Sequence, residues 1–433
     1  MMTNHPCNCA KIPGACVHTG SALPAMNAGQ NALNKQLRSP PVLAAFIDGL
    51  RPDSVEHMPF VSSLSKPARI RTELGYSITC HPSMYTGVWP EQHLSWFIWK
   101  YDPDTSPFRW LKETGWSKIP DTSYTRYGLY RLTKVFKSNS AFFSLPFPAF
   151  VPIKNLPYFD VTEKKFWDED QFNPHFPTIF EIFRERGIST NIVGMDKTAS
   201  NAAEKILRTV PTFSDFTYLF FGDIDYVSHM KGHDSPQARE RLRRVDQAIE
   251  LWYRSAVKTY GEPLFMLWSD HGHIPIEEQV DVARVFHSHG LDIDDFIHFV
   301  DSNYIRFWFR NENEQKQVER VVPDLGKGFI ITPEIAERYH VRMPDNRYGD
   351  LIFYLEAPAV FHKGTFNVFG RKLTSPDVSM HGYSPENSGV DGTLVTNRNI
   401  SFSRRPILQD IPPTLLKHFK IPVPDYMVGD SLW

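Results

Sequence analysis

Six residues of this 433-residue chain have the side chains and the local settings of metal ligands. They are Asp48, Asp225, His229, Asp270, His271 and His381. Asp225 and His229 are four positions apart, so on a helix both side chains would point to one side. Carboxylates and imidazoles bind zinc and other divalent transition metals. Each pattern alone is equally well explained by ordinary surface or core residues, but the full set predicts a site for two metal ions.

Acidic residues follow three apolar runs that are typical of strands buried on both faces. The runs are residues 42–47, 217–221 and 264–268. They are followed by Asp48, by Asp223 and Asp225, and by Asp270. Because the carboxyl ends of parallel strands line the ligand crevice of an open α/β sheet, we expect these acids to converge there. A carboxylate beside a buried strand is costly unless it is paired or bound to metal, which favours a ligand role for Asp48.

Helical patterns lie between these runs. Residues 177–186 carry apolar side chains on one face and stop at Gly187, and Ser235 with Pro236 has the pattern of an N-cap followed by a first helical residue. The alternation predicts an α/β fold with a mostly parallel central sheet flanked by helices. Two stretches interrupt it. Residues 96–176, rich in aromatics and prolines, predict an insertion that folds over the core, and residues 280–372 predict a small α+β cap subdomain.

The first 36 residues are rich in Gly, Asn, Ala and Ser and show no periodicity. We therefore expect residues 1–36 to be a disordered tail and residues 37–433 to form the catalytic domain. Three of the four cysteines, Cys7, Cys9 and Cys16, lie in this tail and form no disulfide framework, which predicts a reducing, cytoplasmic setting. With His5 and His18 they offer an alternative metal site, although their spacing matches no zinc module.

Charge and hydropathy exclude several classes of partner. The formal net charge is −2 and the Lys and Arg residues are dispersed, so we expect neither a nucleic-acid groove nor a polybasic membrane anchor. The chain has no apolar run near the ~20 residues of a membrane span, and its beginning has no signal-peptide pattern. A site that handles phosphate would have to take its positive charge from metal ions.

The local motifs and their order resemble the type I phosphodiesterase/nucleotide pyrophosphatase family of the alkaline phosphatase superfamily. In chain order the motifs are Asp48-Gly49, Thr-Gly-Val-Trp-Pro-Glu-Gln-His at residues 86–93, Asp225 with His229, Asp270-His271-Gly272, and His381-Gly382-Tyr383. The segments at residues 410–416 and 421–424 look like the superfamily's closing helix and tail. This resemblance spans roughly residues 41–433, although the insertion at 96–176 matches nothing. It implies an alkaline-phosphatase-like core that cleaves a phosphodiester or pyrophosphate bond in a small-molecule phosphoester.

The resemblance also assigns the ligands. Asp225, His229 and His381 would hold one zinc ion. Asp48, Asp270, His271 and the nucleophile would hold the other, with manganese or iron as alternative metals. Two divalent ions about 4 Å apart clamp an in-line phosphoryl transfer.

The nucleophile is expected before a helix. The family has a Thr followed by Phe-Pro-Asn, nine residues before its Thr-Gly, and counting back from Thr86 gives Ser77. Ser77 is therefore the expected nucleophile, which would form a covalent phospho-enzyme. Thr79 is the alternative if the alignment carries a gap, and Ser83 lies too far into the helix. Cys80 stands where the family has its phosphate-contacting Asn, so contacts to substrate oxygens must come from elsewhere.

Other functions remain as alternatives. A phosphotransferase that moves a phosphoethanolamine-type head group could use the same site, whereas the Cys/Ser-x-Pro-Ser-Arg signature of sulfatases is absent at residues 77–81. A cofactor-independent phosphoglycerate mutase would use a similar set of metal ligands but fits the local motifs less well. A non-catalytic binding protein would not need all six ligands.

His233 and His273 are expected to be solvent-facing or to lie behind the ligands. The aromatic insertion could hold a base or a lipid, or form a core of its own.

Overall fold

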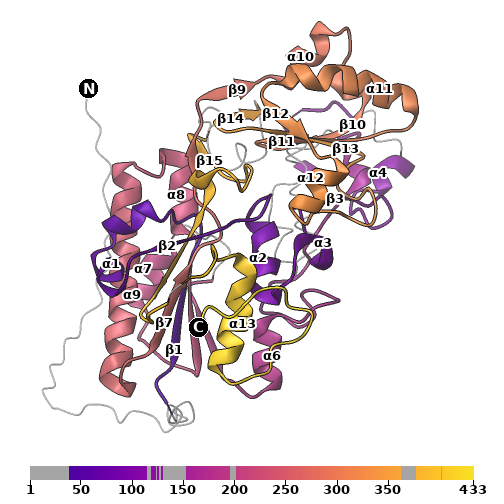
Figure 1. The fold of residues 1–433 in the computed structure, drawn as a ribbon. Helices are drawn as coiled ribbons and strands as arrows, with labels where there is room; N and C mark the ends of the chain where they lie inside the picture. Colours follow the sequence, from indigo (N-terminus) through magenta and orange to yellow (C-terminus); the bar gives the residue numbers. More distant parts are fainter. Residues whose placement is uncertain are drawn as a thin grey trace, which may run out of the picture. The chain divides into compact units, whose positions relative to one another are not determined.

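The computed structural model of the chain describes residues 39–114, 119–122, 124–125, 128–129, 153–195, 201–361, 377–400 and 402–433 (Figure 1). The expected tail and its cysteines lie outside the described residues, as do the insertion residues 130–152. Cys80, in the described part of the chain, is a buried free thiol.

A six-stranded mixed sheet forms the centre of the described fold, in the order β2-β16-β7-β1-β6-β5. Its strands are β2 (Ala68–Ile70), β16 (Gly392–Thr396), β7 (Leu264–Trp268), β1 (Val42–Ile47), β6 (Phe216–Phe221) and β5 (Thr190–Val193). β7, β1, β6 and β5 run parallel, and β16 runs antiparallel to both of its neighbours. The predicted α/β class with a mostly parallel sheet is confirmed.

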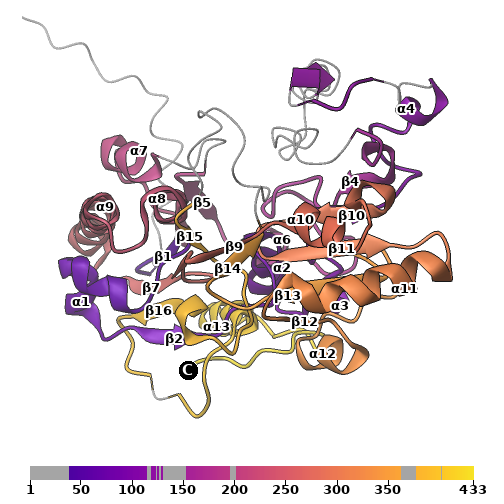
Figure 2. The same ribbon diagram turned by 90° about the horizontal axis from the view of Figure 1, so that it is seen from above.

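Helices cover both faces of this sheet. α2 (Ser77–Thr86), α6 (Ile179–Glu185) and α13 (Ile411–His418) pack on one face, whereas α1 (Pro59–Leu64), α7 (Ala202–Arg208) and α9 (Pro236–Tyr260) pack on the other. Figure 2 shows α9 and α7 on one side of the strands and α13 and α2 on the other. β1 is buried along its whole length because its side chains alternate between these two cores. Such a strand reads as one continuous apolar run.

Local signals explain where the helices begin and end. The Ser235 hydroxyl accepts a hydrogen bond of 3.1 Å from the Ala238 amide, so it caps α9 as the sequence predicts. α2 ends at Gly87, whose φ of 75° lies in the left-handed region. α8 (Asp223–Lys231) starts directly after β6, and the short α3 (Pro90–His93) follows α2.

A second, antiparallel sheet forms the cap, in the order β10-β11-β13-β12. Its strands are β10 (Ile297–Val300), β11 (Tyr304–Trp308), β13 (Leu351–Leu355) and β12 (Gly328–Ile330), accompanied by α10 (Val282–Ser288), α11 (Glu312–Val321) and α12 (Pro333–Arg338). Two strand pairs flank the cap sheet along the chain. β9 (Glu278–Val280) pairs in parallel with β14 (Ala359–Phe361), and β8 (Ile274–Pro275) pairs antiparallel with β15 (Ser379–Met380). The cap is thus an α+β unit.

The described part of the aromatic insertion packs mainly on the cap sheet. It contains β3 (Trp99–Tyr101), α4 (Trp110–Glu113) and β4 (Phe159–Val161). The Phe159 ring lies 5.7 Å from the Phe299 ring and 5.0 Å from the Trp308 ring, both on cap strands. Trp167, also in the insertion, packs instead against the central sheet, with its ring 5.5 Å from the Tyr218 ring of β6. The alternative that the insertion forms a core of its own needs correction, because most of its core is shared with cap strands.

A membrane-spanning helix is absent from the described residues, since none of their helices combines the necessary length and apolar character.

Glu73, in the loop before α2, generates a stability prediction. Burial raises the pKa of its carboxyl to about 7 from an ordinary value of 4.5, despite the hydrogen bond that Gln409 donates. Between these values the folded protein holds a proton that the unfolded chain has released. The free energy of unfolding should therefore fall as the pH rises through this window, by roughly 3 kcal/mol at most. The Glu73→Gln variant cannot ionise, and urea denaturation at about pH 5 and about pH 8 should show a smaller decrease than in the wild type. Identical decreases would contradict this assignment.

Candidate metal centre

The predicted ligands meet at the carboxyl ends of β1, β6 and β7. Asp48 directly follows β1, Asp225 lies in the first turn of α8, and Asp270 follows β7 at an interval of one residue. The loops are joined by backbone contacts, because the Asp225 amide donates to the Asp48 carbonyl at 3.0 Å. The Gly49 amide donates to Asp270 Oδ1 at 3.3 Å. His381, just after β15, completes the group, so the expected convergence at strand ends is observed.

The first cluster contains Asp225, His229 and His381. Asp225 Oδ1 lies 3.2 Å from His229 Nε2 and 3.5 Å from His381 Nε2. His229 Nδ1 donates to the Ser379 carbonyl at 3.1 Å, which leaves its Nε2 directed at the carboxylate. Although burial lowers the pKa of His229, the neighbouring Asp225 raises it overall to about 9. The Asp225 carboxylate therefore stabilises positive charge at His229, whether a proton or a metal ion supplies it.

The second cluster contains Asp48, Asp270, His271 and Ser77. His271 Nε2 lies 3.3 Å from Asp270 Oδ2, 3.4 Å from Asp48 Oδ1 and 3.0 Å from Ser77 Oγ. His271 Nδ1 donates to the Gly272 carbonyl at 3.1 Å, so Nε2 is again the nitrogen that faces the acids. Burial and the neighbouring Asp270 raise the pKa of Asp48 well above its ordinary range.

The donor sets and their spacing fit divalent metal ions. Ligands at ~2.0–2.1 Å from a tetrahedral zinc ion stand about 3.3 Å from one another. The separations of 3.2 and 3.5 Å in the first cluster, and of 3.3 and 3.4 Å in the second, lie close to this value. Mixed carboxylate and imidazole ligands suit zinc, manganese or iron. The His271 and His381 rings stack with centroids 3.6 Å apart, which brings the two clusters side by side.

The three candidate hydroxyls have different environments. Ser77, the first residue of α2, lies within the second cluster, with its Oγ 3.5 Å from Asp48 Oδ1. Thr79 is fully buried and donates to the Trp96 carbonyl. Ser83 is also buried, 3.1 Å from His93 Nε2. Cys80 Sγ lies 3.5 Å from the Thr72 hydroxyl, so its thiol contacts the protein core.

Three other residues lie near the motifs. Asp223 was expected among the converging acids but is not part of the site, because its carboxylate accepts from Arg241 at 2.7 Å and from the Ala203 amide at 3.1 Å. Of the two positions expected for His273, solvent-facing or behind the ligands, the structure shows the second. His273 is fully buried, with Nε2 3.1 Å from Asp225 Oδ1 and Nδ1 3.2 Å from Ser379 Oγ. His233, also buried, lies 2.8 Å from Arg51 Nη1.

His81 is the site residue that the sequence analysis missed. Its Nε2 lies 3.9 Å from Asp270 Oδ2, and it groups with Asp48 and Asp270 as a possible metal-binding set. Burial lowers the pKa of His81 to about 4, so the imidazole is neutral near pH 7. The signal was present in the sequence, because His81 lies four positions after Ser77 and a helix places such residues on one side.

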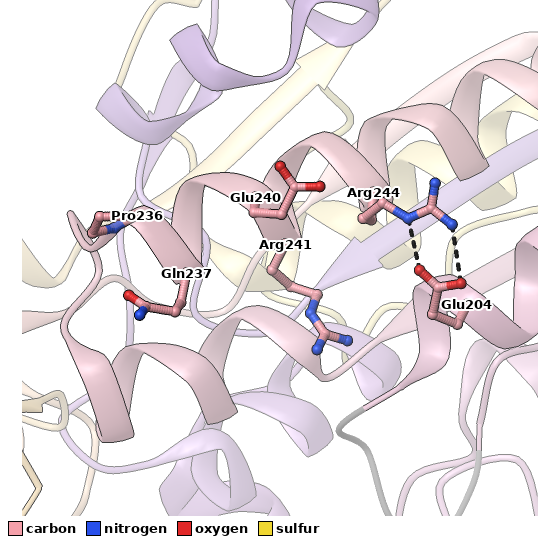
Figure 3. A pocket seen from close by; sticks show the side chains of 6 residues that line it. All are labelled: Glu204, Pro236, Gln237, Glu240, Arg241 and Arg244. Atoms are coloured by element: carbon pink, nitrogen blue, oxygen red, sulfur yellow. Dashed lines mark hydrogen bonds and ion pairs between the residues drawn. The ribbon is translucent and has the colours of Figure 1, made fainter.

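A separate pocket of about 510 Å³ lies between α7 and α9, away from these residues (Figure 3). It is lined by Glu204, Pro236, Gln237, Glu240, Arg241 and Arg244. Arg244 forms two hydrogen bonds with Glu204, of 2.6 and 3.0 Å. Arg244 thus joins α9 to α7, whereas Arg241 joins α9 to Asp223 of α8.

Comparisons with known proteins identify the family of this chain. Residues 42–384 match the family described as type I phosphodiesterase / nucleotide pyrophosphatase. The structure of human ectonucleotide pyrophosphatase / phosphodiesterase 5 aligns with a TM-score of 0.61 at 14% identity, covering 91% of this chain and 98% of that chain. An inactive variant of the murine protein in complex with AMP aligns with a TM-score of 0.60 at 13% identity, covering 89% and 96%. Comparison with the sequences of curated proteins gives no match. The chain belongs to the type I phosphodiesterase/nucleotide pyrophosphatase family, and it is a hydrolase of that kind with an alkaline-phosphatase-like α/β fold.

Proposed function

We propose that this hydrolase cleaves a phosphodiester or pyrophosphate bond through a covalent intermediate on Ser77, at a site that holds two zinc ions. The observation that carries the proposal is the position of the Ser77 hydroxyl. It lies between ligand-type atoms, 3.0 Å from His271 Nε2 and 3.5 Å from Asp48 Oδ1. Asp225, His229 and His381 would hold one ion, and Asp48, Asp270, His271 and Ser77 would hold the other.

The two ions would lower the pKa of the attacking oxygen and neutralise charge on the transferred phosphoryl group. In the first step Ser77 Oγ would form a bond to phosphorus while the bond from phosphorus to the leaving oxygen breaks, and the proton that Oγ gives up would pass to the leaving oxygen or to solvent. In the second step water would attack the phospho-Ser77, the bond from phosphorus to Oγ would break, and a proton of that water would return to Oγ. Because Ser77 is the first residue of α2, the amides of that helix end favour the charge that develops on the phosphoryl oxygens.

A structural relative supports the class of substrate. The murine protein is described as inactive after a threonine-to-alanine substitution and was solved with AMP. A hydroxyl nucleophile and a nucleotide substrate are therefore reasonable for this chain too, with a small-molecule diester or pyrophosphate as its partner. The cytoplasmic setting expected from the sequence stays a prediction.

Metal dependence is the first test of this function. The purified protein should contain about two zinc ions per chain and hydrolyse bis-p-nitrophenyl phosphate faster than the corresponding monoester. Removal of the metal with a chelator should abolish turnover, and added Zn²⁺ should restore it. Atomic absorption gives the metal content, and release of p-nitrophenol gives the rate. Metal without hydrolysis would favour the phosphotransferase alternative, and absence of metal would refute both functions.

The nucleophile can be identified with two matched variants. Ser77→Ala should lower kcat by at least ~10³-fold, because no covalent intermediate can form. Thr79→Val keeps the shape of the side chain but loses the hydrogen bond to the Trp96 carbonyl. It should cost roughly 1–3 kcal/mol in the free energy of unfolding and leave the turnover of the folded protein largely intact. Quenched-flow trapping of the phospho-enzyme provides the second measurement. An active Ser77→Ala variant, or an inactive but folded Thr79→Val variant, would overturn the assignment.

A further inference from the structure

His81 lies on α2 beside the second cluster and has no role in the function proposed above. It is one helical turn after Ser77, and its side chain retains only 14% of its exposure. The ring meets Phe46 at a centroid distance of 5.5 Å, Tyr85 at 6.0 Å and Phe220 at 6.4 Å. These aromatic neighbours fix the ring from several sides and direct its Nε2 toward the acids.

Two polar atoms at this place are buried and form no hydrogen bond with the described residues, His81 Nε2 and Asp270 Oδ2, although Asp270 Oδ2 lies within ion-pair distance of His271 Nε2 at 3.3 Å. His81 Nε2 and Asp270 Oδ2 are 3.9 Å apart, which is too far for a hydrogen bond between them. A buried polar atom without a partner costs about 1–3 kcal/mol. Both costs disappear if the two atoms share one cation. Their distance suits this, since ligand atoms on opposite sides of a metal ion stand farther apart than hydrogen-bonding atoms do.

A third ligand-type atom belongs to the same group. One carboxylate oxygen of Asp48 lies within 4.8 Å of both His81 Nε2 and the Asp270 carboxylate. Asp48 and Asp270 are also the acids that contact His271. His81 therefore approaches the second cluster from the α2 side.

We propose that His81 is a further ligand of the metal ion held by Asp48, Asp270 and His271. This inference rests on the two-metal site proposed above. The second ion then has four protein side chains in addition to Ser77, whereas the first has Asp225, His229 and His381. The first ion keeps an open position for water or a substrate oxygen, and the second is the more tightly bound of the two.

Metal binding without substrate tests this inference. We would load wild-type protein, His81→Gln and His93→Gln with Zn²⁺, dialyse them against a chelator and measure zinc per chain. His93→Gln is the matched control, because it also removes a buried imidazole near α2, one that binds Ser83 outside both clusters. His81→Gln should lose one ion, with at least ~10- to 100-fold weaker Zn²⁺ affinity at one site. Wild type and the control should keep two ions.

Cobalt substitution shows which ion is lost. Asp225→Asn should remove the first ion, so the visible spectrum of its Co²⁺ form reports the second. Adding His81→Gln to Asp225→Asn should abolish that spectrum. The double variant Asp225→Asn with His81→Cys should regain the Co²⁺ spectrum, with an added thiolate-to-cobalt band in the near ultraviolet. Circular dichroism must show that each variant is folded.

The outcomes separate the two proposals. If the wild type binds no zinc, the proposed function and this inference both fail. If the wild type and His81→Gln both bind two zinc ions with equal affinity, only the ligand role of His81 is overturned. The ligand role is overturned by equal affinity even if His81→Gln has lost activity, because the imidazole would then act on the substrate.

Discussion

The mutual repulsion of three carboxylates constrains the whole site. Asp48, Asp225 and Asp270 meet where three neighbouring strands end, and burial together with Asp270 and Asp225 raises the pKa of Asp48 well above its ordinary range. Asp225 differs. Burial opposes its ionisation, yet the imidazoles around it, His229 first, hold its pKa well below the ordinary range. The imidazoles around Asp225 therefore stabilise its negative charge, whereas the neighbouring carboxylates destabilise the negative charge of Asp48.

The cap holds both sides of this site through one buried residue. Asn303, just before β11, accepts a hydrogen bond of 2.6 Å from the Tyr76 hydroxyl and donates one of 3.1 Å to the His381 carbonyl. Tyr76 precedes the proposed nucleophile, and His381 belongs to the first cluster. Gly382 allows this close approach, because its φ is 81° and a Cβ there would lie 2.3 Å from the Tyr76 ring. The cap therefore helps to position the proposed nucleophile and the first cluster.

Contacts with the insertion hold the cap strand β11 in place. Arg306 of β11 is fully buried, with its guanidinium 4.7 Å from the Phe97 ring and 4.8 Å from the Phe299 ring. Its Nη1 donates to the Trp99 carbonyl at 2.8 Å. A buried cation among aromatic faces and carbonyls is stabilised only while these partners stay in place. The insertion residues and the cap strands thus depend on each other.

Much of the fold could be predicted because its strands obey a simple physical rule. β1 and β7 have the predicted bounds, since a strand buried on both faces is one apolar run ended by polar residues. The same rule located Asp48 and Asp270, which follow such runs. The insertion could not be placed, because aromatics such as Phe159 pack against cap strands far away in sequence, whereas Trp167 packs against the central sheet. Asp223 was misplaced, because only the folded chain brings Arg241 and the α7 amides to its carboxylate.

The geometry of α2 explains why the sequence predicts the proposed metal ligands better than the contacts to substrate. Ser77 and His81 face the acids, whereas Thr79 and Cys80 turn into the core. Burial raises the pKa of the Cys80 thiol well above its ordinary range, so this group is no replacement for an amide that contacts phosphate oxygens. The motifs that this chain shares with the family are those that supply the clustered carboxylates and imidazoles. The departures fall on contacts to substrate oxygens, and those contacts determine which phosphoester is bound.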